Sequence, residues 1–79
     1  MSGEASTLSS QESLPIQLNG EPFELAHGAT VLDVLEGLDR HPRTVAVEYN
    51  GDILPRDRYG KTRLQAGDRL EIVHFVQGG

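Results

Sequence analysis

Hydrophobic and polar residues alternate along two neighbouring stretches near the start of the chain. Residues 14–18 alternate, Asn19-Gly20 interrupts the pattern, and residues 23–25 resume it. A period of two is typical of a strand with one buried face, and Asn-Gly is a strong hairpin signal because both residues tolerate positive φ. The pattern predicts a β-hairpin, and Pro22 places its second strand at a sheet edge or at the start of that strand.

The period then changes from two residues to that of a helix. Thr30 and Asp33 are spaced as a capping box, with Asp in place of the usual Glu. Gly37 weakens a helix by about 1 kcal/mol relative to Ala, and Pro42 is expected to end it. We predict one amphipathic helix of about ten residues. Its core-facing stripe consists of Val31, Val34, Leu35 and Leu38.

Strand patterns return after the helix. Residues 45–49 alternate and stop at the turn signal Asn50-Gly51, and Ile53-Leu54 is a brief apolar piece before Pro55. Residues 56–60 are polar and predict an irregular segment with one helical turn at most. The last strand is expected from residue 69 to about residue 76.

The element order is a hairpin, a helix, and then two or three strands. One main helix packed on a mixed sheet of four or five strands is an economical way to bury these faces. The order also places the first and last strands side by side at the centre. We predict an α+β fold with the β-grasp arrangement over residues 14–77. Residues 1–13 hold five serines and one Leu and are expected to be a disordered extension; residues 78–79 are expected to be a flexible tail.

Composition excludes several classes of function. The 79 residues include 7 basic and 12 acidic side chains, a net charge of −5, which argues against a nucleic-acid surface. The chain has no Cys, and therefore no thiolate nucleophile, thiolate metal ligand or disulfide. No apolar run could span a membrane, and the features of a signal peptide are missing. We expect a soluble, cytoplasmic protein that binds neither nucleic acid nor membrane.

Candidate catalytic and metal-binding motifs are weak. His27, His41 and His74 fall in three different elements without metal-ligand spacing. Gly60-Lys61-Thr62 resembles the end of a phosphate-binding loop, but Pro55 stands where that motif needs Gly. No pair of carboxylates sits beside an apolar pocket that would separate their pKa values. We predict that the chain is not an enzyme and holds no metal or cofactor itself.

The last strand and the two residues after it suggest a different kind of site. Gly78-Gly79 has no Cβ atoms, so it can carry a carboxylate into a cleft too narrow for other residues. If Leu70 and Ile72 face the core, Val73 and Phe75 point the other way. Such apolar residues near the tail suggest a docking patch; packing under a loop is the alternative.

A basic cluster follows the third strand. It consists of Arg56, Arg58, Lys61 and Arg63, and all seven Lys and Arg residues of the chain lie between Arg40 and Arg69. Such a cluster is either a solvated face or a surface that steers a partner. We assign Arg56 and Arg58 to partner docking together with Val73 and Phe75.

In this order and spacing, several motifs resemble those of the ubiquitin-like sulfur-carrier proteins, most closely the ThiS family of thiamine biosynthesis. The resemblance covers residues 16–79, whereas residues 1–13 depart from the compact family pattern. The matching motifs are Ile16-Gln17-Leu18-Asn19-Gly20, Thr30-Val31, Val45-Ala46-Val47-Glu48-Tyr49-Asn50-Gly51, Leu54-Pro55-Arg56, Gly67-Asp68-Arg69-Leu70-Glu71-Ile72-Val73 and Gly78-Gly79.

This resemblance implies a carrier chemistry at Gly79. An adenylating enzyme of the ubiquitin-activating type would activate the Gly79 carboxylate with ATP and Mg²⁺, which that partner binds. Sulfur from a donor such as a cysteine desulfurase would replace AMP and leave a thiocarboxylate, and thiazole synthase would take the sulfur. The alternatives are a sibling carrier, such as the small subunit of molybdopterin synthase, and a ubiquitin-like interaction module without sulfur transfer. The segments Asn50-Gly51 and Pro55-Arg56 favour the thiamine carrier over the sibling, and the Gly-Gly end favours both over the module.

Overall fold

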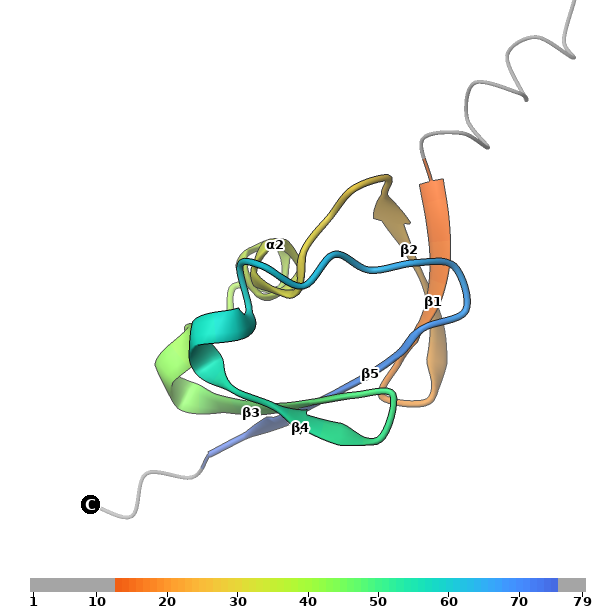
Figure 1. The fold of residues 1–79 in the computed structure, drawn as a ribbon. Coiled ribbons are helices and arrows are strands. Elements are labelled where there is room, and N and C mark those ends of the chain that lie inside the picture. The colour runs from red at the N-terminus through yellow and green to blue at the C-terminus, as the bar shows by residue number, and fades with distance from the viewer. Residues whose placement is uncertain (1–12, 76–79) are drawn as a thin grey trace, which may run out of the picture.

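The computed structural model describes residues 13–75 of the chain. These residues form a five-stranded sheet with the strand order β2-β1-β5-β3-β4, packed against one main helix (Figure 1). The predicted α+β class with a mixed sheet is therefore confirmed. The elements are β1 (Ser13–Leu18), β2 (Glu21–Ala26), α2 (Val31–Gly37), the 3-10 helix η1 (Pro42–Thr44), β3 (Val45–Tyr49), β4 (Asp52–Leu54), the 3-10 helix η2 (Arg56–Arg58) and β5 (Arg69–His74).

The first and last strands pair at the centre of the sheet, as predicted. β1 and β5 run parallel, with Gln17 opposite Arg69 and Leu18 opposite Leu70. β2 pairs with β1, and β3 pairs with both β5 and β4, in antiparallel fashion. α2 covers one face of this sheet, and among residues 13–75 no helix covers the other (Figure 1).

Both predicted Asn-Gly turns have the required backbone. Asn19 and Gly20 have φ values of 51° and 83°, and Asn50 and Gly51 have values of 52° and 92°. Two successive positive φ angles are those of the turn whose twist suits a two-residue hairpin. Pro22 lies in β2 at the edge of the sheet, where its missing N–H removes no internal hydrogen bond.

The sheet begins one residue earlier than the predicted boundary. Ser13 is the first residue of β1, and its hydroxyl donates to the Glu24 carboxylate of β2 at 2.8 Å. The rest of the predicted extension, residues 1–12, lies outside the described residues. At the other end, β5 stops at His74, before the predicted end near residue 76. Gly78-Gly79 also lies outside the described residues.

The capping box predicted for the helix is present. The Thr30 hydroxyl accepts from the Asp33 N–H at 3.2 Å, and the Asp33 carboxylate accepts from the Thr30 N–H at 2.9 Å. The end of the helix, however, was predicted too late. α2 stops at Gly37, and Asp39 has a φ of 60°. The N–H of Arg40 bonds to the Leu35 carbonyl at 2.8 Å, so a left-handed closure ends the helix before Pro42 is reached.

Eleven buried hydrophobic residues form one core between α2 and the sheet. Tyr59 belongs to it at 3% exposure, although its surroundings in the sequence are polar. The segment that contains Tyr59 is also hydrogen-bonded to the first turn of α2. The Val31 N–H donates to the Thr62 carbonyl, and the Leu32 N–H donates to the Tyr59 carbonyl. The core residues are Leu14, Ile16, Leu25, Val31, Val34, Leu35, Val45, Val47, Tyr59, Leu64 and Leu70.

Candidate docking face beside the chain end

β5 presents apolar side chains on both faces, as its sequence predicted. Leu70 is buried and Ile72 is half-buried on the side of α2, whereas Val73 is 59% and Phe75 is 41% exposed. The Phe75 N–H still donates to the Thr44 carbonyl at 2.8 Å, so the pairing with β3 continues one residue beyond β5. The predicted exposure of Val73 and Phe75 is confirmed. Their role in docking stays a prediction.

A third apolar side chain joins them on the same face. Ile53 of β4 is 77% exposed and lies opposite Glu48, which in turn lies opposite Glu71 of β5. Residues directly opposite each other in neighbouring strands share a face of the sheet. We use the name outer face for the surface of the sheet turned away from α2 that Ala46, Glu48, Ile53, Glu71, Val73 and Phe75 form.

Sequence reasoning missed Ile53, although a signal was available. The Asn50-Gly51 turn is a two-residue turn, so Glu48 must lie opposite Ile53. Because Val47 faces the core, Glu48 and therefore Ile53 must face outward. The register set by the turn thus decides the exposure of Ile53, whereas the short apolar pair Ile53-Leu54 by itself does not.

Arg56 and Arg58 are both exposed and lie in η2. The Nε of Arg56 donates to the Pro42 carbonyl at 3.2 Å. This bond joins η2 to η1, the turn that leads into β3 beside the end of β5. Arg56 is thereby held at the end of the molecule where Phe75 lies. It has a structural contact that its sequence did not predict, and its docking role, like that of Arg58, stays a prediction.

At the opposite end of β5, one carboxylate joins two turns. Asp68 accepts from the Tyr49 hydroxyl at 2.8 Å, from the Asn50 side-chain amide at 3.2 Å and from the Gln65 N–H at 2.8 Å. The Asn50 side-chain oxygen accepts from the Arg69 N–H at 2.8 Å. Burial raises the pKa of the Tyr49 phenol above its usual range, and the hydrogen bond to Asp68 and the Asp68 charge raise it further. This network fixes where β5 begins.

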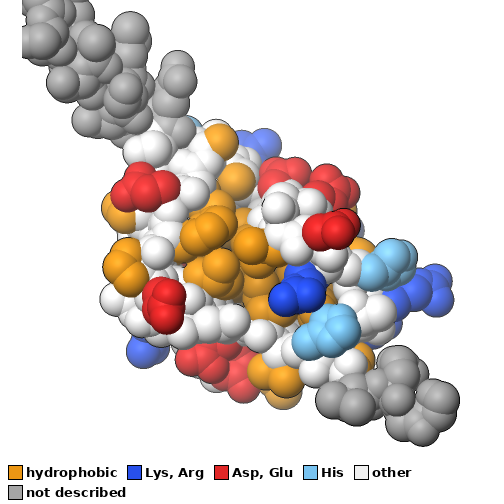
Figure 2. All heavy atoms as spheres, turned by 180° about the vertical axis from the view of Figure 1, so that it is seen from behind, with side chains coloured by type: hydrophobic (Ala, Val, Ile, Leu, Met, Phe, Trp, Pro, Cys, Tyr) orange, Lys and Arg blue, Asp and Glu red, His pale blue; other side chains and the backbone are white. Residues whose placement is uncertain are grey.

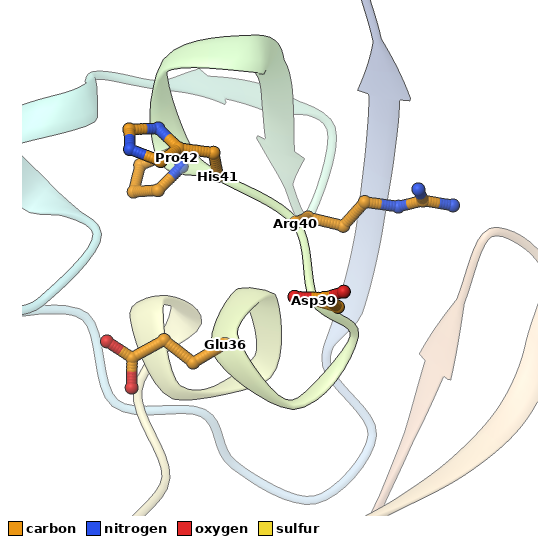
Figure 3. Close-up of a pocket in the computed structure, with 5 residues that line it drawn as sticks. All are labelled: Glu36, Asp39, Arg40, His41 and Pro42. Carbon is orange, nitrogen blue, oxygen red and sulfur yellow. The ribbon is translucent and has the colours of Figure 1, made fainter.

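A hollow of about 420 Å³ lies where α2 ends, lined by Glu36, Asp39, Arg40, His41 and Pro42. Glu36 and Arg40 point away from each other (Figure 3), and the His41 Nδ1 accepts from the Arg43 N–H at 3.1 Å. No acid, base and nucleophile converge there. Within residues 13–75, no group of His, Asp or Glu could hold a metal ion. No helix in that range is long and apolar enough to cross a membrane.

Comparisons with known proteins place this geometry in a family. The model of the ThiS family matches residues 16–79. The sulfur carrier protein ThiS of Escherichia coli is 30% identical over 66 residues, which are 84% of this chain and 100% of that protein. ThiS of Bacillus subtilis is 37% identical over 65 residues, 81% of this chain and 98% of that protein.

Two further similarities concern a longer protein and a solved structure. The thiazole synthase of Magnetococcus marinus is 44% identical over 66 residues, which are 84% of this chain but only 20% of that protein. The crystal structure of the thiamine biosynthesis protein ThiS from Geobacter metallireducens has a TM-score of 0.72 at 30% identity, covering 84% of this chain and all of that one. The chain thus belongs to the ThiS family of small sulfur-carrier proteins with the ubiquitin-like β-grasp fold.

Proposed function

We propose that this chain carries sulfur for thiazole formation in thiamine biosynthesis. The sulfur would be attached at the carboxylate of Gly79. The observation that carries the proposal is the ThiS family match, which extends through Gly78-Gly79. An activating enzyme would join the carboxylate to the α-phosphate of ATP, with release of pyrophosphate. A persulfide sulfur would then attack the acyl carbon as AMP leaves. A second thiol would cleave the resulting acyl disulfide and release the thiocarboxylate.

The fold supports this division of labour between carrier and enzyme. We assign ATP, Mg²⁺ and the persulfide to partners of the chain. The four residues that follow Phe75 can span at most roughly 14 Å. The body of the carrier must therefore dock close to the reacting carboxylate. The outer face lies beside the end of β5 and offers exposed apolar side chains. A few such side chains, once buried in an interface, tend to contribute most of the binding energy.

The charged residues near that end support a role in orienting the carrier. Arg56 is held beside η1 by its bond to the Pro42 carbonyl, and Arg58 follows in the same 3-10 helix. We assign both to steering of an activating enzyme with acidic groups around its entrance. Charges at the rim of an interface chiefly change the association rate and its salt dependence.

The proposed sulfur acceptor is thiazole synthase, and the proposed sulfur donor is an enzyme such as a cysteine desulfurase. Proteins named thiazole synthase from Magnetococcus marinus and Paramagnetospirillum magneticum contain a segment similar to this chain. This similarity supports the pairing of a carrier domain with that enzyme. It is the reason to prefer thiamine biosynthesis over another sulfur-containing product.

The test is the intact mass of the chain after co-expression with a candidate activating enzyme and a cysteine desulfurase. The expected result is a gain equal to the mass difference between sulfur and oxygen, lost again when thiazole synthase and its substrates are added. A chain lacking Gly79 serves as the matched control and should fold normally but gain no mass. An unchanged mass for the complete chain, with an enzyme that is active on another ThiS protein, would contradict the proposal.

A further inference from the structure

An apolar groove lies between β2 and α2, on the side of the sheet that α2 covers, whereas the outer face is turned away from α2. Its volume is about 240 Å³. Seen from behind, the molecule shows hydrophobic side chains gathered in one patch, with acidic side chains around most of it and basic and His side chains on one side (Figure 2). The groove is lined by Phe23, Leu25, Ala26, Ala29, Val34 and Gly37, together with Glu24 and Asp33.

One wall of the groove is a sheet edge whose outward backbone groups have no strand beside them among residues 13–75. β2 is the outermost strand. The N–H groups of Gln17 and Asn19 donate to the carbonyls of Asp68 and Leu70, both at 2.9 Å. The odd-numbered residues of β1 therefore direct their backbone N–H and C=O groups toward β5. The even-numbered residues of β1 direct theirs toward β2. Their partners there are Glu21, Phe23 and Leu25.

The alternate residues of β2 consequently direct their backbone groups away from the sheet. They are Pro22, Glu24 and Ala26. Pro22 has no N–H, and the Ala26 carbonyl is used by the Ala29 N–H at 3.1 Å. Both backbone groups of Glu24, the Ala26 N–H and the Pro22 carbonyl remain in position to pair with an added strand. This edge can therefore accept a short extended segment.

The other wall contains a glycine that the fold does not require. Gly37 is the last residue of α2 and has no positive φ, and a Cβ built on it would meet no atom within 4 Å. The left-handed residue that closes the helix is Asp39 instead. Gly is a weaker helix former than Ala. Because it has no side chain, Gly37 leaves the groove open beside Ala29 and Val34.

The charge and size of the groove indicate what would fill it. Residues 1–39 contain no Lys or Arg, and four exposed acidic residues lie on β2 and α2: Glu21, Glu24, Asp33 and Glu36. The volume is below the about 300–1,000 Å³ of pockets for drug-sized ligands, which suits one or two side chains of a peptide. An extended peptide that adds to a sheet edge places alternate side chains on one face.

We propose that the groove between β2 and α2 binds an extended peptide segment of a partner protein. The segment pairs with the backbone of Glu24, inserts an apolar side chain over Gly37 and carries Lys or Arg at the flanking positions. β2 and β4 are the two opposite edges of the sheet, so the groove and the outer face can be occupied at the same time. The proposal does not depend on the chemistry assigned to Gly79.

The test begins with selection on the complete chain from a displayed library of nine-residue peptides, in which apolar residues alternate with Lys or Glu. Selection is expected to enrich Lys at the flanking positions. A synthetic selected peptide should shift the backbone amide signals of Glu24, Ala26 and Gly37 in nuclear magnetic resonance spectra. Gly37→Leu should fill the groove and weaken peptide binding at least tenfold, while Gly37→Ala should weaken it less and raise the melting temperature.

Two control variants separate this groove from other surfaces. Val73→Ser on the outer face and Ala66→Leu in the loop before β5 should each leave the peptide affinity within twofold of the original chain. Failure to enrich any peptide, enrichment of Glu over Lys, or unchanged binding by a folded Gly37→Leu variant would each overturn the proposal. So would amide shifts at Glu24 that depend on protein concentration without peptide, because they would show a second copy in the groove.

Discussion

Ile53→Ser is the sharpest test of the outer face, because it removes a large apolar side chain that contributes little to folding. Ile53 is 77% exposed. Complete burial of such a side chain is worth about 1.5–3 kcal/mol, so burial of its exposed part in an interface would contribute about 1–2 kcal/mol. The dissociation constant for the activating enzyme should rise by about 5- to 30-fold. The cost in folding stability should stay within about 0.5 kcal/mol, as for other surface substitutions.

The assay is a titration of the activating enzyme with the carrier, combined with pyrophosphate exchange. If Ile53 acts only in docking, the KM for the carrier rises while kcat is unchanged, because the same contact is lost in ground state and transition state. Gln65→Ser, at an exposed and uncharged position outside the outer face, is the matched control. Ile53→Leu should retain the affinity within about twofold, since it keeps the apolar area.

An Ile53→Ser variant that folds and binds like the original chain would refute the assignment of the outer face. The double change of Val73 and Phe75 to Ser is a weaker test. Phe75 is only 41% exposed, and its buried part also stabilises the fold, so that variant would lose stability as well as affinity.

Three further outcomes are expected. Gly78→Ala should dock normally but exchange pyrophosphate on the order of 100-fold more slowly, because misplacing a reacting group can cost that much; normal exchange would contradict a narrow cleft. Tyr49→Phe should lower the unfolding free energy by about 1 kcal/mol at neutral pH. Because the phenol pKa is raised in the folded chain, the contribution of Tyr49 is complete below about pH 10 and disappears above that pH. Denaturant unfolding should therefore show no such alkaline loss in the Phe variant. Asp39→Gly should raise the melting temperature, with a gain of up to about 1 kcal/mol from relief of a left-handed backbone; a lower melting temperature would contradict it.

Features fixed by neighbouring residues could be predicted from the sequence. The Asn-Gly turns and the Thr30 capping box depend on a few adjacent residues whose preferred backbone angles and hydrogen bonds match the observed ones. The central pairing of β1 with β5 also followed from the order of the elements. The exposure of Val73 followed from simple alternation along β5.

Features fixed by distant contacts could not be predicted in this way. Asp tolerates positive φ better than most residues, and Asp39 ends the helix three residues before Pro42, the helix breaker on which the sequence prediction relied. Tyr59 stands among polar residues without periodicity, and it is buried because the segment after η2 folds back over the start of α2. The groove over Gly37 depends on the distance between a strand and a helix, which no local pattern encodes.

The central position of β5 also has a consequence for synthesis of the chain. β1 is made first and β5 last among the strands, yet they are neighbours, and β5 alone connects the β1–β2 pair to the β3–β4 pair. A nascent chain that ends before Arg69 has two separate hairpins and a helix with only part of a sheet to cover. Such long-range pairing delays folding until nearly the whole domain has been translated. Chains whose translation stops before β5 would stay unfolded and be degraded by proteases. The folded population is therefore limited to chains that contain β5, the strand that precedes Gly78-Gly79.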